Sequence, residues 1–367
     1  MAAPGWSESV RTLIRTMNSF HLPAFFHGAP WYQHSLSDNS TVLRGSSLWL
    51  ADLGTALDIN LSFLPLQRAS GSSKSACFPF LVEGQQVGSV PVSVAKELSA
   101  YPEVFTVYQN ADTFPSHQVE LNTKLLAYEQ RSAAVHQVLE ELRGKNLFQC
   151  LNEWRDERYE VMRQFSDQPL MNMERAATPL FGVKQYGVHI NGYLWRGGEL
   201  FMWLARRSST KPTYPGLLDN LASSSVQPSS LYPLQLAAGG ISTGLGIKET
   251  LIKECQEEAC IPESIASHAK PVGSVSYTYE SPKGIYPECQ FVFDLELPED
   301  FVPKPGDGEV QEFYLWPLEK VKEAIATSDF KPNCALVVLD FLVRHSFIQP
   351  DQERYYLEFV EGLHRTL

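Results

Sequence analysis

Three closely spaced glutamates are the residues of this sequence best suited to chemistry. Glu254, Glu257 and Glu258 stand at positions i, i+3 and i+4, so they share one side of a helix. Carboxylates in this arrangement repel one another unless a cation neutralises them, and carboxylate oxygens are preferred ligands of Mg²⁺. The spacing therefore predicts a site for one or more magnesium ions. The alternative interpretation is a solvated helix face on which Lys253 pairs with Glu249 and Glu257.

The helix that must position these glutamates is expected from about Ile247 to Ala259, after a glycine-rich turn that begins at Gly239. Leu251, Cys255 and Ala259 recur on one arc of this helix, at about 100° per residue. This apolar arc is expected to be buried and to anchor the acidic arc beside it.

Alternating, aromatic-rich segments predict strands before and after this helix. They give two expected hairpins, at 78–90 and 186–207, a strand-like segment at 154–161 and a later strand at 291–297. Helical spacing of apolar residues predicts helices at 134–142, 333–345 and 352–364. We therefore expect an α+β chain with an irregular region at 1–76, an α+β domain at 77–170, a domain with the acidic helix at 180–325, and C-terminal helices at 326–367.

The segment from Gly239 to Ile261 resembles the Nudix box, whose pattern is G-x5-E-x7-R-E-U-x-E-E-x-G-U with U apolar. The matching residues are the Gly239-Gly240 turn, Lys253-Glu254, Cys255, Glu257-Glu258 and Ile261. Three features depart from the pattern: Lys253 replaces arginine, Cys260 replaces glycine, and a shorter turn leaves Leu245 in the place of the first glutamate. These departures resemble the Nudix enzymes described as thiamin pyrophosphokinase-related.

The resemblance to this subfamily extends from about residue 77 to residue 325. It includes Phe80-Leu81-Val82, Trp154-Arg155-Asp156-Glu157, the segments 187–193 and 215–220, and Asp307-Gly308-Glu309-Val310. It implies an N-terminal α+β domain followed by a Nudix α/β/α sandwich with a mixed sheet. It also implies Mg²⁺-dependent hydrolysis, with Mn²⁺ as an alternative ion, of a diphosphate bond in oxidised or damaged thiamine diphosphates or in 8-oxoguanine nucleoside diphosphates.

The same resemblance assigns roles to individual residues. Glu254, Glu257 and Glu258 would bind the metal ion, and Glu257, Glu309 and Lys253 would serve catalysis. Arg207 and Lys211 would bind the diphosphate oxygens. Alternative interpretations remain for the last three positions: Glu309 follows an Asp-Gly pair typical of a solvated turn, and the two basic residues could be ordinary surface charges.

Net charge and motif content limit the partners. The 30 Lys and Arg residues against 42 Asp and Glu give a net charge of -12, which argues against a nucleic-acid polymer or an anionic membrane as the main partner. The small diphosphate that the family resemblance implies is an anionic partner, so it would need a local cation. Leu245 follows Gly244 at the position where a P-loop requires lysine, so ATP-dependent phosphoryl transfer is not supported.

The six cysteines lie far apart and predict neither a zinc site nor a disulfide framework. Neither an apolar run of the length of a membrane span nor a signal peptide is evident, so a cytoplasmic location is expected. The alternative is mitochondrial, because Val10, Leu13, Ile14 and Met17 stand at helical spacing near two arginines.

Two further expectations concern irregular segments and activity. Residues from about 27 to 75 have no sustained period, and the serine-rich residues 221 to 235 are an expected insertion relative to the enzymes that the chain resembles. We expect both segments to lack regular structure and long-range packing. The departures from the Nudix box leave one alternative function open, a catalytically weak Nudix-fold module that binds a nucleotide or a partner. Mg²⁺-dependent phosphate release distinguishes the two functions.

Overall fold

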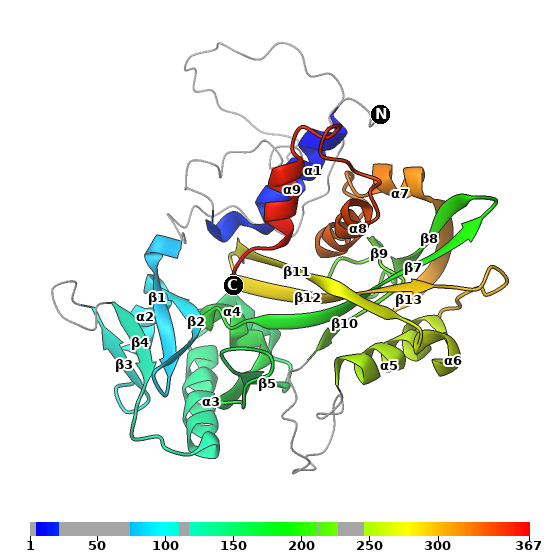
Figure 1. The fold of residues 1–367 in the computed structure, drawn as a ribbon. Helices are drawn as coiled ribbons and strands as arrows, with labels where there is room; N and C mark the ends of the chain where they lie inside the picture. Colours follow the sequence, from blue (N-terminus) through cyan, green and yellow to red (C-terminus); the bar gives the residue numbers. More distant parts are fainter. Residues whose placement is uncertain (1–4, 22–73, 110–116, 212, 227–245) are drawn as a thin grey trace, which may run out of the picture.

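The computed structural model describes residues 5–21, 74–109, 117–211, 213–226 and 246–367. These residues form a smaller N-terminal sheet with its own core and a larger sheet with helices on both faces (Figure 1). The expected combination of an α+β domain and an α/β/α sandwich is therefore confirmed. The domain boundaries that we expect from the sequence remain a prediction.

The smaller sheet has the strand order β2-β1-β4-β3. Its strands are β1 (Cys77–Val82), β2 (Gln85–Pro91), β3 (Phe105–Tyr108) and β4 (Gln118–Leu121), and β1 and β2 form the first expected hairpin. The helices α2 (Val92–Leu98) and α3 (Tyr128–Gly144) share its core. A two-stranded ladder of β5 (Arg158–Val161) and β6 (Met171–Glu174) and the short helix α4 (Thr178–Phe181) lead to the larger sheet. The strand expected at 154–161 thus begins only at Arg158.

The larger sheet has the strand order β11-β12-β7-β8-β13. These strands are β7 (Gln185–Arg196), β8 (Glu199–Arg207), β11 (Lys270–Ser281), β12 (Gly284–Glu296) and β13 (Val310–Pro317). The sheet is mixed because β12 runs parallel to β7 whereas its other pairs are antiparallel. The second expected hairpin, β7 and β8, is confirmed.

The strands β7 and β8 pair only near their connecting turn and then diverge. β10 (Ala222–Val226) pairs with β7 over Tyr186 to Ile190, and β9 (Leu218–Asp219) pairs with the far end of β8. The segment 218–226 therefore fills the fork between the two long strands. This placement brings a short connecting segment into the middle of the sheet.

Two helix layers cover the larger sheet (Figure 1). α5 (Ile247–Ala259) and α6 (Glu263–Ala266) lie on one face, where Leu251, Cys255 and Ala259 are buried as expected. The other face is covered by α1 (Trp6–Met17), α7 (Leu318–Ala324), α8 (Pro332–Arg344) and α9 (Tyr356–Leu363). None of the helices in the described ranges is both long and apolar enough to span a bilayer.

The helix α1 belongs to the second of these layers, although the region 1–76 is expected to be mostly irregular. Its residues Trp6, Val10 and Ile14 are buried, and Arg11 and Arg15 pair with Glu358 of α9. A 3₁₀ helix at Lys74–Ala76 precedes β1, and residues 22–73 of this region lie outside the described part of the chain.

The expectation that 221–235 lacks regular structure is wrong for its first residues. Leu221 and Ala222 are buried, and Ala222 to Val226 pair with β7 in regular antiparallel register. The context around serine has more influence on strand formation than serine's own preference, so pairing with the long strand β7 decides the conformation of this segment. Composition alone therefore does not predict this strand. Residues 227–235 lie outside the described part of the chain.

Candidate functional site

The acidic face of α5 is turned toward β10. The side chain of Glu258 is only 7% exposed, and its Oε2 accepts a hydrogen bond of 2.9 Å from the backbone N–H of Ser223. The side chain of Glu254 lies beside Ser224 on the same strand. Two of the three predicted metal ligands are therefore directed toward the strand in the fork, and Glu258 is held there by its hydrogen bond.

Glu257 lies at the solvent side of the same cluster. Its side chain is 47% exposed, and its Oε2 lies 3.3 Å from Nζ of Lys253. This ion pair is the one expected at i+4, whereas the carboxylate of Glu249 folds back against Gly246 at the start of the helix. Lys253 therefore forms an ion pair with Glu257, whereas the carboxylate of Glu249 lies at the start of the helix, beside Gly246.

Burial and mutual repulsion act together on these carboxylates. Burial raises the pKa of Glu258 well above its ordinary value, and the nearby charges of Asp219, Glu254 and Glu309 raise it further. Burial likewise raises the pKa of Glu254, with Glu257 and Glu309 acting in the same direction. The described carboxylates therefore form one coupled cluster with an excess of negative charge and oxygen donors, which fits a hard divalent cation such as Mg²⁺.

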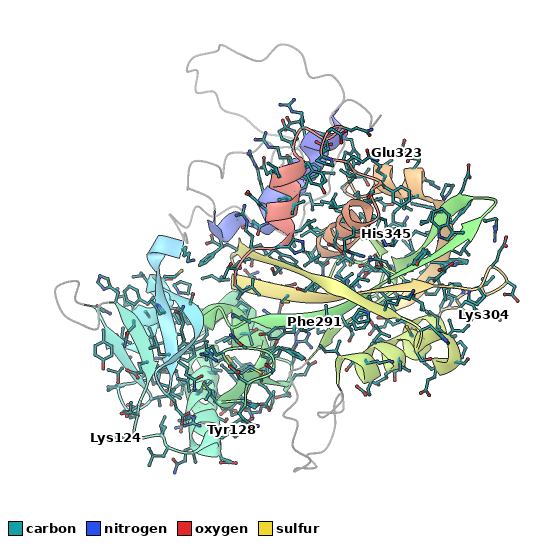
Figure 2. The ribbon with its side chains drawn as sticks, in the orientation of Figure 1. Lys124, Tyr128, Phe291, Lys304, Glu323 and His345 are labelled. Atoms are coloured by element: carbon teal, nitrogen blue, oxygen red, sulfur yellow. The ribbon has the colours of Figure 1, made fainter. Side chains whose placement is uncertain are left out.

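The loop before β13 brings Glu309 to this cluster. The backbone N–H of Lys304 (labelled in Figure 2) donates to the carbonyl of Ala259, and that of Gly306 donates to the carbonyl of Glu258. A Cβ at Gly306 would lie 2.1 Å from the carbonyl oxygen of Glu257, so only glycine fits this close approach. This loop places Glu309 in a pocket that Glu258 also lines, and the catalytic role of Glu309 remains a prediction.

A small pocket lies between the end of β8, the strand β9 and this loop. Arg207, Asp219, Glu258 and Glu309 line it. Lys211 reaches the same place, where its ammonium group pairs with the carboxylate of Glu309. The pocket therefore combines residues predicted for metal binding, catalysis and diphosphate binding.

Arg207 is held rigidly at the wall of this pocket. Its Nη1 donates to Oδ2 of Asp219 at 2.8 Å, and its Nε and Nη2 donate to the carbonyls of Tyr214 and Thr213. The side chain is only 11% exposed. Arg207 is therefore no ordinary surface charge.

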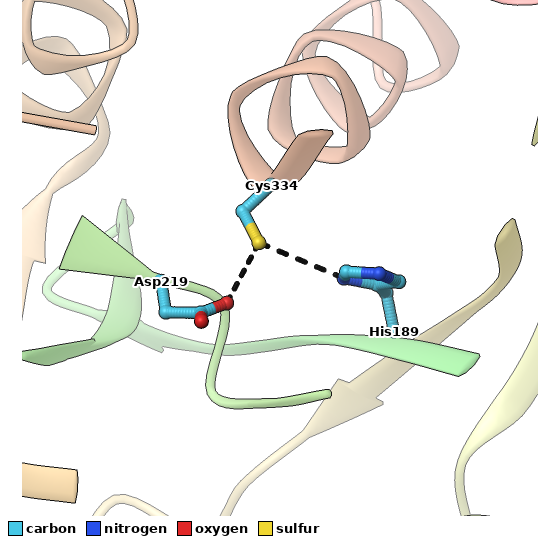
Figure 3. Close-up of side chains that lie close together, drawn as sticks. All are labelled: His189, Asp219 and Cys334. Carbon is cyan, nitrogen blue, oxygen red and sulfur yellow. Dashed lines mark hydrogen bonds between the residues drawn. The ribbon is translucent and has the colours of Figure 1, made fainter. Parts of the chain in front are cut away.

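Asp219 also belongs to a buried polar group, of which Figure 3 shows Asp219, Cys334 and His189. Its Oδ2 also lies 3.2 Å from Nζ of Lys331, while its Oδ1 accepts from Sγ of Cys334 at 2.7 Å. His189 lies 3.9 Å from the same sulfur, and its Nδ1 is hydrogen-bonded to Oδ1 of Asn220 at 2.8 Å. We call Asp219, His189, Cys334 and Lys331 the Asp219 cluster.

The charges in the Asp219 cluster follow from burial and pairing. Burial alone would raise the pKa of Asp219, but Lys331 and Arg207 outweigh it and hold that pKa below the usual range. Burial lowers the pKa of His189 to about 4 and raises that of Cys334, so both side chains are neutral at pH 7. One carboxylate thus forms ion pairs with two largely buried cations.

The ligand atoms of His189, Asp219 and Cys334 lie within 4.8 Å of one another, the spacing of a metal centre. The two cations already bound to Asp219 oppose a third positive charge, and His189 uses Nδ1 for Asn220. We therefore interpret the cluster as a support for Arg207. Sequence reasoning missed it because its members come from β7, β9 and the start of α8.

The helix α5 ends just before Cys260, which stands where the box usually has glycine and has the left-handed conformation that glycine favours. Cys260 has a φ of 52°, in the left-handed region, and the N–H of Ile261 donates to the carbonyl of Cys255 at 3.0 Å. The N–H of Cys260 donates to the carbonyl of Gln256 at 3.2 Å, which is the bond of an αL cap, where glycine is the preferred residue.

Replacing this cysteine is expected to be harmless. Cys260→Gly should leave hydrolysis unchanged and raise the free energy of unfolding by up to about 1 kcal/mol, because glycine relieves the left-handed strain. Urea denaturation measures the effect, with Cys260→Ala as the control that loses the thiol but keeps the strain. A clear loss of stability in Cys260→Gly alone would show that packing of the thiol outweighs the strain.

Comparison with known proteins gives two kinds of match. The family model "Domain of unknown function (DUF4743)" matches residues 60–185. "Nudix hydrolase 20, chloroplastic" of Arabidopsis thaliana is 41% identical over 290 residues, which are 78% of this chain and 72% of that protein. "Nudix hydrolase 24, chloroplastic" of the same plant is 39% identical over 278 residues, 76% of this chain and 70% of that protein. The solved structure of DR0079 from Deinococcus radiodurans is 20% identical, with a TM-score of 0.34, and the match covers 50% of this chain and 98% of that one.

Proposed function

We propose a substrate class and a set of residue roles for this chain, which belongs to the Nudix hydrolase family and is therefore a hydrolase of phosphorus-containing anhydrides. The proposed substrates are damaged thiamine diphosphates or 8-oxoguanine nucleoside diphosphates. The observation that supports the site is the coupled cluster of Glu254, Glu257, Glu258 and Glu309 beside the fixed guanidinium of Arg207.

Glu254, Glu257 and Glu258 would hold Mg²⁺ in this proposal. The bound ion would neutralise charge on the diphosphate and increase the acidity of a water molecule. Arg207 then donates hydrogen bonds to the diphosphate from a position that Asp219 fixes. Lys253 keeps the carboxylate of Glu257 oriented through its ion pair.

Glu309 is the proposed base, and its present partner suggests how it is released. Lys211 now pairs with Glu309, but a diphosphate in the pocket offers Lys211 a stronger anionic partner. When Lys211 turns to the substrate, Glu309 is free to accept the proton of the attacking water. Substrate binding and activation of the base are thereby linked.

The proposed function is tested by product release. The purified protein should release product from one or more of thiamine diphosphate, oxidised thiamine diphosphate and 8-oxoguanine nucleoside diphosphates with Mg²⁺ but not with EDTA. Glu257→Gln should lower this rate by more than about a hundredfold, because the amide lacks the charge that the cation requires. The exposed Glu263→Gln, on α6 outside the cluster, is the matched control. Wild-type turnover in Glu257→Gln would remove Glu257 from the mechanism, and binding without turnover in the wild type would favour the binding-module alternative.

The role of Glu309 is tested separately. Glu309→Gln should lower kcat by about a hundredfold or more while KM changes little, because a general base acts on the chemical step. An unchanged kcat in Glu309→Gln would contradict the assignment.

Partner and location complete the proposal. The net charge of -12 supports a small-molecule partner rather than a nucleic-acid polymer or a membrane. We propose a cytoplasmic location, with mitochondria as the alternative; the names of the two plant relatives place those proteins in chloroplasts. The oxygen-donor set supports Mg²⁺ as the ion, and Mn²⁺ is a reasonable substitute.

A further inference from the structure

Asn220 stands at the break between β9 and β10, in the fork of the large sheet. The residue before it, Asp219, holds Arg207, and Ser223, three residues after it, donates to Glu258. Asn220 therefore stands between the residue that holds the proposed diphosphate-binding guanidinium and the residue that holds a proposed metal ligand. It also lines the same small pocket as Arg207 and Glu258.

Two polar groups of Asn220 are paired, and a third is not. Its backbone N–H donates to Oδ1 of Asp219 at 2.8 Å, and its own Oδ1 lies 2.8 Å from Nδ1 of His189. The side-chain Nδ2 is buried and has no hydrogen-bond partner among the described residues. Because Asn220 is only 2% exposed, bulk solvent does not supply the missing partner. An unpaired buried donor costs free energy, which an acceptor entering the pocket would recover.

His189 sets the orientation of this amide. Burial lowers the pKa of His189 to about 4, so its ring is neutral at pH 7 and carries one N–H. An amide oxygen only accepts hydrogen bonds, so the contact between Nδ1 of His189 and Oδ1 of Asn220 requires the proton on Nδ1. Because this N–H holds the amide oxygen, Nδ2 is left as a donor that His189 does not use.

The chemistry of the pocket favours an anionic oxygen as the partner of Nδ2. The carboxylates of Glu258 and Glu309 line the pocket but do not accept from this group. An N–H group repels a metal cation, whereas Arg207 and Lys211 make the adjoining wall attractive to phosphate oxygens. Hydrogen bonds to ionised acceptors are about twice as strong as those to neutral ones. A non-bridging oxygen of a diphosphate therefore fits this donor best.

We propose that Asn220 is a further substrate-binding residue, whose Nδ2 donates a hydrogen bond to a non-bridging oxygen of the diphosphate. His189 is the positioning residue that orients this donor, and the inference rests on the proposed function. The Asp219 cluster thus supports two donors to one ligand. Asp219 holds the guanidinium of Arg207, and His189 holds the amide of Asn220.

Binding of an uncleavable diphosphate tests the role of Asn220. The probe is methylenediphosphonate, whose P–C–P bridge resists hydrolysis, and calorimetry with saturating Mg²⁺ measures its Kd. Asn220→Asp keeps the shape and the acceptor for His189 but replaces the donor by a charged acceptor. It should raise the Kd by at least about tenfold, the loss expected for a charge-assisted hydrogen bond. The exposed Asn152→Asp, outside the pocket, is the matched control for the added charge and should bind as the wild type does.

An uncharged variant and a spectroscopic signal complete this test. Asn220→Ser adds no charge and shortens the side chain, so it should also weaken binding by about tenfold. In wild-type protein labelled with ¹⁵N-asparagine, the side-chain N–H signals that are absent from Asn220→Ser belong to Asn220. These signals should move downfield when methylenediphosphonate is added to the Mg²⁺-loaded protein, because the N–H groups then donate to an anion.

The positioning role of His189 has its own pair of variants. The amide in His189→Asn can donate from near the position of Nδ1, whereas His189→Met offers no donor. His189→Asn should therefore keep the Kd of the probe within about threefold of the wild-type value, and His189→Met should raise it by about tenfold. Equal Kd values in the two variants would show that His189 does not orient the amide.

The outcomes separate this inference from the proposed function. An equal Kd in the wild type and both Asn220 variants, an equal weakening by Asn220→Asp and Asn152→Asp, or unmoved side-chain signals would overturn the role of Asn220. None of these results would affect hydrolysis by the wild type. If the probe binds through Asn220 but no diphosphate is hydrolysed, the proposed function fails and the inference stands. Failure of the wild type to bind the probe would overturn both.

Discussion

Replacement of Glu258 by glutamine is expected to abolish Mg²⁺-dependent hydrolysis and, in the absence of metal, to raise the melting temperature of the protein. Both effects have the same origin, a carboxylate that is 7% exposed and surrounded by other acids. The amide keeps an oxygen that accepts from the N–H of Ser223, so the contact with β10 survives. Activity should fall by more than about a hundredfold, because the charge that binds the cation is lost.

The pH dependence of this stabilisation has a definite sign. The folded-state pKa of Glu258 lies above the value of about 4.3 in an unfolded chain, so the folded state is the one that binds the proton more tightly. The stability contributed by this group is present below pH 4.3 and is lost as the pH rises through the folded-state pKa. Metal-free wild type should therefore be less stable than Glu258→Gln at pH 8, and the difference should shrink as the pH is lowered.

Thermal unfolding at several pH values, with EDTA or Mg²⁺, measures this prediction. Mg²⁺ should raise the melting temperature of the wild type and have little effect on Glu258→Gln, because the ion stabilises only the charged cluster. Glu263→Gln is again the control, and it should behave as the wild type in both buffers. A variant less stable than the wild type in EDTA at pH 8, or an undiminished response to Mg²⁺, would contradict a cation site at Glu258.

Periodic sequence features predict the elements that carry the site. The apolar arc of Leu251, Cys255 and Ala259 correctly indicates the buried side of α5, because helical periodicity is a local property. The two hairpins follow from alternation in the same way. The prediction for Glu309 comes from the family resemblance and not from a periodic pattern. The position of Glu309 near the glutamates of α5 depends on the loop anchored at Gly306.

Features that depend on distant partners could not be predicted from the sequence. Serine-rich β10 is a strand because β7 offers it a pairing edge in the fork. The Asp219 cluster joins residues that are 115 and 145 positions apart, and none of them stands in a metal-binding motif.

Asp219→Asn is expected to destabilise the protein strongly, by about 3–5 kcal/mol. Asp219 is the acid shared by Arg207 and Lys331, whose side chains are 11% and 14% exposed. The amide keeps the shape of the carboxylate but leaves two largely buried positive charges without a counter-charge. Cys334→Ala removes only a neutral donor to the same carboxylate, so it should cost less than about 1.5 kcal/mol.

A double substitution separates charge from packing in the Asp219 cluster. If unpaired charge causes the loss, Asp219→Asn combined with Lys331→Met should recover part of the stability in urea denaturation, because one of the two unpaired charges is removed. Lowering the pH should reduce the difference in the free energy of unfolding between the wild type and Asp219→Asn. Because the folded-state pKa of Asp219 is lowered, the stability that its charge contributes is present above about pH 3.9 and is lost as the pH falls through the folded-state pKa. A loss below 1 kcal/mol, or a double variant weaker than Asp219→Asn alone, would show that Arg207 and Lys331 are neutralised by other groups. Arg207 would then need a different support, and its fixed position beside Glu258 would no longer depend on Asp219.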